Sequence, residues 1–344
     1  MQHEITKAGL LLDENGHITE AGYAKKLIKK YDRKMIKAGN LRIKEWDYYL
    51  IYNQDYAVAI TVDDNSYMGL NSLSLIDFNT TEETTKSFMS FMTKGKVGLP
   101  ATSEIGDVKV ENKKYKFELL NNGKTRIIKV YVKNFKDKMD FNAEFRLTDE
   151  PQDSMVIVTP FKEKKTHFYY NQKIVGMKAS GKVQLGDNLI DFDSKSTRAI
   201  LDWGRGVWTY KNTWYWGAGT GIVKGHEIGF NIGYGFGDTS NASENMVFVD
   251  GIAHKLDQIT FNIPKDAKGK DDFMSKWTFS SNDKRFEMKF TPIIDRHSNT
   301  NALIISSNQH QVFGKFNGTI VLDDGKKIIL KDFLAFAEKV VNKW

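Results

Sequence analysis

Alternation of apolar and polar residues with a period of two dominates the middle of the chain. In the first such segment, Trp46, Tyr48 and Leu50 alternate with Asp47 and Tyr49. Successive side chains of a strand point to opposite faces, so this spacing predicts a β-strand. Further strands are expected over residues 57–62, 114–120, 126–133, 141–147, 154–159, 225–238, 246–249, 258–263, 276–280, 286–290, 302–306, 311–322 and 326–330.

Short turns separate these segments. Asn122-Gly123 and Asp324-Gly325 each stand between two alternating runs, which is the pattern of a tight β-hairpin. Helical crossovers between strands are missing from the pattern, so a doubly wound parallel sheet is not expected. The sequence therefore predicts a mostly β fold of antiparallel barrels or sandwiches.

Two segments instead show helical spacing. The first is expected to begin with Thr19 as N-cap and to end near Gly39. Its apolar stripe is Ala24, Leu27, Ile28, Tyr31 and Met35. The second is expected to close the chain, through Phe333, Phe336, Ala337, Val340, Val341 and Trp344. We therefore expect an N-terminal and a C-terminal helix beside the strands.

The expected N-terminal helix carries a basic face. It consists of Lys25, Lys26, Lys29, Lys30, Arg33, Lys34 and Lys37. This face is interpreted as solvated, with peripheral contact to an anionic membrane as the alternative. The net charge is +7, but 43 acidic residues are interspersed among 50 basic ones, so no nucleic-acid partner is expected.

Length and composition limit the organisation of the chain. Its 344 residues suggest a helical segment over 1–40, a first barrel over 41–195 and a second barrel with the C-terminal helix over 196–344. Cysteine is absent, which excludes disulfides, thiolate nucleophiles and thiolate metal ligands. The first residues lack the pattern of a secretory signal, and no apolar run is long enough to span a bilayer. A cytoplasmic protein is expected, and its oligomeric state stays open.

Tryptophan is concentrated in one segment. Trp203, Trp208, Trp214 and Trp216 lie within residues 202–216. Asp202 and Arg205 accompany them. Either these rings form a core with a structural ion pair, or they face a ligand.

The strand expected next along the chain has one face almost bare of side chains. Over residues 225–238 that face holds glycines together with Glu227 and Asn231, and Tyr234 stands on the other face. Such a face marks a bend or a close approach of a large group. That group is either a tryptophan, with Glu227 and Asn231 as hydrogen-bond partners, or a ligand.

Further candidate residues follow in polar segments. The loop after this strand contains Asp238, and Asp295 and His310 come later, so these three are candidate catalytic groups. The candidate ligand-binding residues are Asp202, Arg205, Trp208, Trp214, Trp216, Glu227, Asn231, Tyr234, Glu244, Asn245 and Gln311. No dinucleotide, phosphate-loop, serine-hydrolase or zinc-protease motif occurs, and neither a metal nor a cofactor is expected.

Several of these motifs resemble a known family. They are LLLDENG at 10–16, WDYYLIYN at 46–53, DWGRGVWTYKNTWYW at 202–216, GYGFGDTSNASEN at 233–245 and HQVFGKFNG at 310–318. Together they look like the family named domain of unknown function 2804, over nearly the whole chain. The chain more distantly resembles the carotenoid 1,2-hydratase group, which implies two antiparallel lipocalin-like β barrels in tandem. That resemblance assigns no active-site residue here.

Three functions are compatible with these features. The first is binding of a hydrophobic small molecule, isoprenoid or lipid-like, with acid-catalysed hydration or isomerisation by Asp202, Asp238 or Asp295. Arg205 beside Asp202 argues against Asp202 as the acid, since an ion pair would lower its pKa. The second is a noncatalytic binding or scaffold protein. The third is a carbohydrate-active β protein that pairs Glu227 with Glu244 or Asp238.

Overall fold

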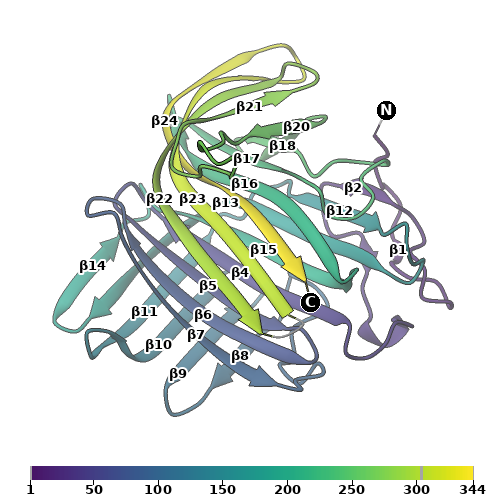
Figure 1. The fold of residues 1–344 in the computed structure, drawn as a ribbon, viewed down its shortest axis with the longest axis horizontal. Helices are drawn as coiled ribbons and strands as arrows, with labels where there is room; N and C mark the ends of the chain where they lie inside the picture. Colours follow the sequence, from purple (N-terminus) through teal and green to yellow (C-terminus); the bar gives the residue numbers. More distant parts are fainter. Residues whose placement is uncertain (1, 303–304, 344) are drawn as a thin grey trace.

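The computed structural model of the protein describes residues 2–302 and 305–343, which form two curled sheets (Figure 1). The first sheet has thirteen strands, and its main path runs in the order β7-β6-β5-β4-β15-β13-β11-β10-β9-β8. Its strands are β2 (Gly22–Ala24), β4 (Ile43–Tyr52), β5 (Tyr56–Asp64), β6 (Met68–Asp77), β7 (Glu82–Phe91), β8 (Val108–Glu111), β9 (Tyr115–Asn121), β10 (Arg126–Lys136), β11 (Met139–Thr148), β12 (Met155–Pro160), β13 (Phe168–Leu185), β14 (Asn188–Phe192) and β15 (Arg198–Val207). All its pairings are antiparallel.

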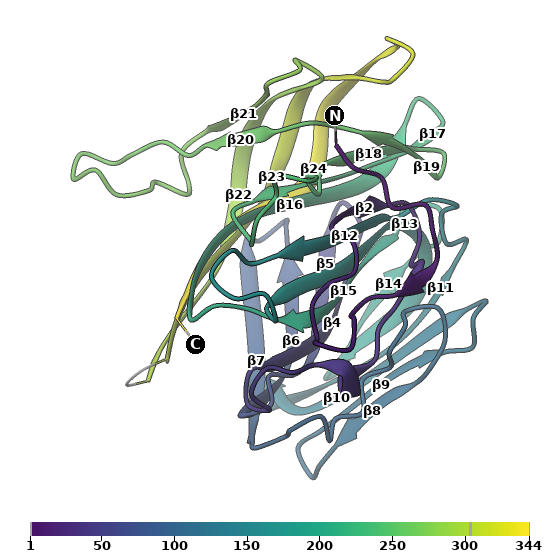
Figure 2. The same cartoon turned by 90° about the vertical axis from the view of Figure 1, so that its right-hand side faces the viewer.

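The second sheet has nine strands in the order β19-β18-β17-β16-β24-β23-β22-β21-β20. They are β16 (Lys211–Val223), β17 (His226–Tyr234), β18 (Met246–Val249), β19 (Ile252–Lys255), β20 (Ile259–Asn262), β21 (Trp277–Ser281), β22 (Phe286–Ala302), β23 (Ile305–Val321) and β24 (Lys327–Lys343). A separate parallel pair joins β1 (Gly9–Leu10) to β3 (Lys29–Lys30). Tandem β barrels fit this arrangement, in which each sheet curls as a half-barrel (Figure 2).

The alternation seen in the sequence distributes apolar side chains over three cores. On β4, Tyr49 and Ile51 enter a core inside the first sheet, while Tyr48 and Leu50 enter a core between the two sheets. A third core fills the second sheet and includes Phe230 of β17. The central strands are therefore buried on both faces, and the two sheets are held together by the middle core.

The expectation of an N-terminal helix is wrong. Its residues form β2, β3 and a 3-10 turn, η1 (Arg33–Met35). The apolar stripe does pack, since Ala24 and Tyr31 are buried in the core of the first sheet. β2 pairs with β12, so this stripe closes one end of the sheet as extended chain. The five apolar residues of the stripe fit a helical period of 3.6, but the same spacing also occurs in irregular chain, so the pattern alone could not separate the two.

The expectation of a C-terminal helix is also wrong, because residues 327–343 form β24. Phe336 faces the core between the sheets, whereas its neighbours Ala335 and Ala337 face the core of the second sheet. A strand buried on both faces is a continuous apolar run, which periodicity cannot separate from a buried helix. Trp344, the last residue of the expected stripe, lies outside the described residues.

Most expected strands and both expected hairpins are present. Asn122-Gly123 joins β9 to β10, and Asp324-Gly325 joins β23 to β24. Sequence reasoning missed the separate strands β6, β7, β8, β13, β14, β15, β16 and β19. The strand expected over 302–306 includes residues 303 and 304, which lie outside the described residues.

The two sheets divide between β15 and β16. β15 pairs with β4 and β13, so residues 198–207 belong to the first sheet. The boundary expected at residues 195–196 concerns folding units and stays a prediction. Within residues 2–302 and 305–343, no helix has the length and apolar character needed to cross a membrane.

A glycine on β15 makes room for an aromatic ring of the neighbouring strand. Gly204 pairs directly with Trp46 of β4, and a Cβ on Gly204 would lie 2.0 Å from the Trp46 ring. The ring lies across the strand and stacks on Tyr169, with 6.1 Å between ring centroids. The bare backbone at Gly204 therefore fixes the position of Trp46.

We predict that Gly204→Ala lowers the free energy of unfolding by about 1–3 kcal/mol, because the Trp46 ring must shift within a packed layer. Urea unfolding measures this change. Gly39→Ala is the matched control, since the nearest heavy atom to a new Cβ there is Arg42 Cγ at 3.9 Å. Equal stability of the two variants would contradict the close contact.

Candidate functional site

A cavity of about 320 Å³ lies between the two sheets and is partly open to solvent. β4, β5, β6, β7, β13 and β15 of the first sheet form one wall, and β16, β22, β23 and β24 of the second form the other. The aromatic residues of the lining are Trp46, Tyr48, Tyr169, Trp208, Trp214, Trp216 and Phe236. The cavity therefore lies between the half-barrels, whose own interiors are filled by the first and third cores.

The far ends of β22 and β23 cover part of this cavity. In Figure 1 both strands pass from the second sheet across the strands of the first. Arg296 of β22 donates from Nε to Ser74 Oγ of β6 at 2.8 Å, and from Nη1 to Gln311 Oε1 at 2.8 Å. The bond to Ser74 ties the long hairpin to the first sheet, and the bond to Gln311 links the two strands of the hairpin.

Glu338 of β24 is a buried carboxyl in the cavity wall. Its Oε1 accepts a hydrogen bond from Trp214 Nε1 at 3.0 Å, and its Oε2 accepts one from Gln311 Nε2 at 3.2 Å. Burial raises the pKa of Glu338 to about 7, although the Trp214 hydrogen bond and the Lys173 ammonium oppose this rise. The carboxyl is therefore close to half protonated at neutral pH.

An ion pair lies in the opposite wall. Lys173 Nζ of β13 is 2.8 Å from Asp202 Oδ2 of β15, and both side chains are buried. The other oxygen of Asp202 accepts from Asn171 Nδ2 at 2.6 Å. Lys173 Nζ also lies 4.0 Å from the centroid of the Trp216 ring, a cation–π contact. Both oxygens of Asp202 are thus engaged by donors from β13.

Two more carboxyls of the lining have raised pKa values. Burial raises the pKa of Asp63 to about 7, against a hydrogen bond that Leu70 N donates to Asp63 Oδ1 at 2.5 Å. Burial also raises the pKa of Glu244, against the charge of Lys173. Protonated carboxyls are therefore available at more than one point of the cavity near neutral pH.

The glycine face of β17 meets the first sheet. A Cβ on Gly229 would lie 2.8 Å from Val175 Cγ1 of β13. Asn231 lies between the tryptophans and the loop that follows, since Trp216 Nε1 donates to its Oδ1 at 2.7 Å and its Nδ2 donates to Glu244 O at 2.8 Å. This glycine face is a close approach of two sheets, and Asn231 holds the Trp216 ring in place.

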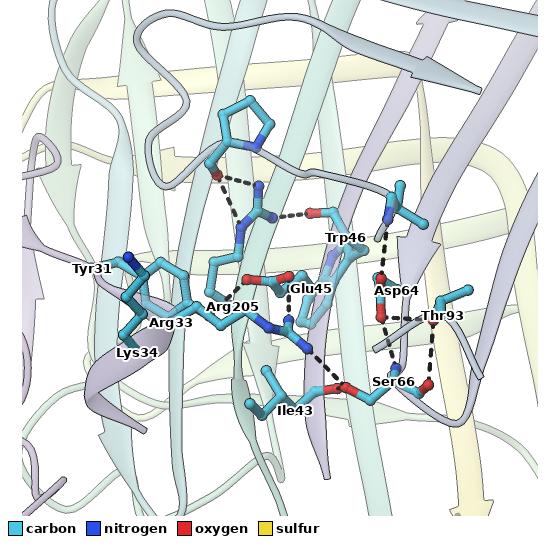
Figure 3. A network of polar contacts seen from close by, with 12 residues as sticks. Tyr31, Arg33, Lys34, Ile43, Glu45, Trp46, Asp64, Ser66, Thr93 and Arg205 are labelled. Carbon is cyan, nitrogen blue, oxygen red and sulfur yellow. Dashed lines mark hydrogen bonds and ion pairs between the residues drawn. The ribbon is translucent and has the colours of Figure 1, made fainter. Parts of the chain in front are cut away.

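Arg205 holds the backbone that carries Trp46 (Figure 3). Its guanidinium donates from Nη1 to Trp46 O at 2.7 Å and from Nη2 to Pro100 O at 2.8 Å. Its ion pair is with Asp47, at 3.0 Å. Figure 3 also shows Arg33 bridging Glu45 and Ser66 at the same end of the first sheet. The contacts of Arg205 therefore hold the backbone and Asp47 beside the cavity wall.

The structure brings about half of the predicted ligand-binding residues together. Those in the cavity lining are Asp202, Trp208, Trp214, Trp216, Glu244 and Gln311. Those outside it are Arg205, Glu227, Asn231, Tyr234 and Asn245, together with the catalytic candidates Asp238, Asp295 and His310. The wall includes Trp208, Trp214 and Trp216 of the tryptophan-rich segment but no residue of the glycine face.

Several residues outside the lining have partners of their own. Glu227 pairs with Arg198 at 2.8 Å and lines a second cavity, whose other lining residues include Val175 of β13 and Gly229 of β17. Tyr234 stacks on Tyr215, with 4.5 Å between centroids, and Asn245 accepts from Gly233 N at 2.7 Å.

The catalytic candidates also have partners. Asp238 lies 3.6 Å from Lys162. Asp295 lies 2.7 Å from His310 Nδ1, and the His310 ring stacks on Phe273. Among the described residues, no group of three or more His, Asp or Glu side chains has a metal-binding arrangement.

Sequence reasoning missed Asp63, Lys173 and Glu338. Glu338 stands within the largely apolar run AFAEKVV at 335–341, and Asp63 follows the apolar residues of YAVAITVDD at 56–64, whereas Lys173 lies in a mixed segment. A buried charge is costly unless it is paired or neutralised, so such positions carry a functional signal. The charge within an apolar run can be read from the sequence, but the arrangement of these strands around one cavity cannot.

Two solved structures are similar to this chain in fold, and one family model matches its sequence. A protein from Nitrosomonas europaea described as AttH is 11% identical, with a TM-score of 0.53, over 90% of this chain and 95% of that one. Kievitone hydratase from Nectria haematococca is 12% identical, with a TM-score of 0.51, over 97% of this chain and 98% of that one. At this low sequence identity, the similarity shows a shared fold and nothing further.

No curated protein matches the sequence. The model of the domain of unknown function DUF2804 matches residues 2–344, and the chain belongs to that family.

Proposed function

We propose that the cavity between the sheets binds a hydrophobic small molecule, isoprenoid or lipid-like, and adds water to one of its carbon–carbon double bonds. The observation that carries this proposal is the Glu338 carboxyl, whose pKa is about 7 and which lies beside Trp214 in an aromatic cavity. An acid with a pKa near the working pH is the most effective proton donor. The solved structure named as a hydratase shares the fold, which agrees with the proposal.

The cavity has the size and the lining of a small-molecule site. Its volume of about 320 Å³ falls at the lower end of the usual range for ligand pockets. Aromatic rings from both sheets, among them Trp46, Trp214 and Trp216, offer apolar surface to a hydrocarbon chain. A ligand of this kind would gain affinity mainly through apolar area removed from water.

The proposed reaction uses one acid and the aromatic walls. The Glu338 carboxyl O–H transfers its proton to one alkene carbon, and the electron pair of the double bond forms the new C–H bond. The faces of the tryptophans stabilise the carbocation on the other carbon. A water molecule bonds to that carbon, and the proton it releases returns to the Glu338 carboxylate. The net change is the addition of water. Loss of a different proton would instead give an isomerised alkene.

Asp202 is a poor candidate for this acid. Its oxygens are already engaged, by the Lys173 ammonium at 2.8 Å and by the Asn171 amide at 2.6 Å. Its negative charge does contribute to the raised pKa of Glu338. The carboxylate pairs of the third functional hypothesis are not brought into one cavity, because Glu227 lines the second cavity, Glu244 lines the first and Asp238 lines neither.

The raised pKa of Glu338 predicts how the free energy of unfolding changes with pH. A carboxyl with a raised pKa stabilises the fold fully below its unfolded pKa, near 4.5, and this contribution is lost as the pH rises through about 7. Relative to Glu338→Gln, the wild type should lose about 3 kcal/mol of unfolding free energy between about pH 4.5 and about pH 7.5. Urea unfolding across this pH range measures the difference in unfolding free energy between the two proteins. Asp63 also has a raised pKa, but it is present in both proteins, so its effect cancels. Parallel pH profiles would contradict the raised pKa.

A second prediction concerns turnover. Incubation with farnesol should yield products heavier by one water, detected by liquid chromatography and mass spectrometry. Glu338→Gln should reduce the rate by about 10²–10⁴-fold, because the amide keeps the shape of the side chain but has no acidic proton. The rate of the wild type should fall as the pH rises above about 7.

The control for this prediction is Glu111→Gln, the same change at an exposed position of β8. It should leave the rate unchanged. Binding of farnesol without turnover by the wild type would reject the catalytic part of the proposal for this alkene and support a binding protein. Equal rates for wild type and Glu338→Gln would exclude Glu338 as the acid.

A further inference from the structure

The cavity between the sheets opens beside strand β7. The exposed residues of its lining lie on two strands, Thr85 and Ser87 on β7 and His297 and Ser298 on β22. The other residues of the lining are buried or partly buried. A ligand therefore enters between β7 and the far end of β22.

An apolar surface continues from this opening along the first sheet. β7 pairs with β6 in one unbroken register, so every second side chain of β7 points to the same face. Met89 and Phe91 therefore continue the row of Ser87 beyond the opening. Met89 pairs with Leu70, which lines the cavity, and Phe91 pairs with Met68. The apolar surface and the cavity wall are thus continuous.

Three side chains of this surface, Met89, Phe91 and Met92, form what we call the mouth patch. They are 60%, 78% and 46% exposed, and among the described side chains Phe91 is the most exposed of the large apolar ones. Met92 also has a φ of 57°, a left-handed conformation that is unfavourable for a residue with a side chain. The mouth patch therefore adds little to the stability of the free protein, and its removal from water would be favourable.

Lysines adjoin the mouth patch. Lys94 and Lys96 follow it directly in the segment KGK, and both are exposed. Lys34 is exposed on η1, the segment that packs beside this loop. Its neighbour Arg33 donates to Ser66 Oγ at 3.0 Å (Figure 3), and Lys94 N donates to Ser66 O at 2.9 Å. Ser66 thus holds the two basic segments together.

Charge and apolar surface together favour an anionic lipid bilayer as the partner. Residues 91–98 contain two lysines and no acidic residue. A second copy docked patch to patch about a symmetry axis would place lysine against lysine, which is unfavourable. An anionic bilayer instead offers negative charge to the lysines and hydrocarbon to the mouth patch.

We propose that the mouth patch, with Lys34, Lys94 and Lys96, docks the protein on an anionic lipid bilayer. The opening of the cavity then faces the hydrocarbon of the bilayer, and a hydrophobic ligand passes into the cavity without crossing water. This inference rests on the proposed function, because the ligand that the bilayer supplies is the one that the cavity binds. It identifies the source of that ligand.

Sedimentation with vesicles tests the lysines. The wild type should bind vesicles of phosphatidylcholine and phosphatidylserine at least about tenfold more tightly than vesicles of phosphatidylcholine alone. Added NaCl should weaken this binding, because it screens exposed charges. The double variant Lys94→Gln and Lys96→Gln should bind the anionic vesicles about twentyfold more weakly, since each lysine near such a surface contributes about fivefold.

The chain contains a matched control for the lysines. The same segment, KGK, occurs at 268–270, where both lysines are exposed on the loop between β20 and β21. The double variant Lys268→Gln and Lys270→Gln has the same net charge as the first double variant. It should bind the anionic vesicles within about twofold of the wild type.

A separate variant tests the mouth patch. Phe91→Ser should weaken binding to the anionic vesicles by about tenfold, because the ring no longer leaves water. Ile329→Ser is the control, since Ile329 is 64% exposed on β24 and lies outside the patch. Both variants should keep the thermal midpoint of the wild type, which shows that they fold.

Binding of dissolved farnesol, measured by quenching of tryptophan fluorescence without vesicles, separates the docking from the proposed function. Phe91→Ser and the Lys94 and Lys96 variant should bind it as the wild type does. Failure of the wild type to bind farnesol would overturn the proposed function, and the vesicle assay would then decide the docking alone.

Three outcomes would overturn the docking and leave the proposed function standing. The first is equal binding of the wild type to the two kinds of vesicle, or binding to neither. The second is an equal loss of binding in the Lys268 and Lys270 variant. The third is a dimer in sedimentation equilibrium that Phe91→Ser dissociates, which would assign the mouth patch to a second copy of the chain.

Discussion

The structure depends on one constraint, which is that the central strands of both sheets are buried on both faces. Strand β4 directs Tyr49 into the core of the first sheet and Tyr48 toward the second sheet, and β24 divides Ala335 and Phe336 in the same way. The core between the sheets therefore fixes their relative position. Any space left in that core is surrounded by rigid strands, which is the usual requirement for a precise site.

This arrangement changes where a ligand is expected. A lipocalin-like barrel suggests an interior binding site, but residues such as Phe145 and Phe230 fill the two half-barrels. The cavity instead uses the outer faces of the sheets, where Trp216 of one sheet lies over Lys173 of the other. Both sheets contribute the groups that the proposed chemistry needs, so neither half would retain the site alone.

The sequence predicted local elements better than their combination. Period-two segments such as the one around Tyr48 identified strands. Of the four clustered tryptophans, Trp208, Trp214 and Trp216 lie in the cavity lining, whereas Trp203 lies in the core of the first sheet. The C-terminal helix was wrong because the continuous burial of β24 removes the alternation on which strand assignment depends. The N-terminal helix was wrong because a short apolar stripe with a period of 3.6 also fits irregular chain. Glu338 and Lys173 were missed because both come next to Trp216 only through the pairing and packing of strands distant in sequence. The one local signal is the charge of Glu338 within a largely apolar run.

Location of a bound ligand tests the central claim most directly. A farnesol derivative with a photoreactive diazirine on its hydrocarbon chain can be cross-linked to the protein, and the modified residues can be identified by mass spectrometry. A ligand between the sheets should label β4 and the segment that contains Trp214 and Trp216. Labelling of residues inside either half-barrel, such as Phe145 or Phe316, would contradict the account.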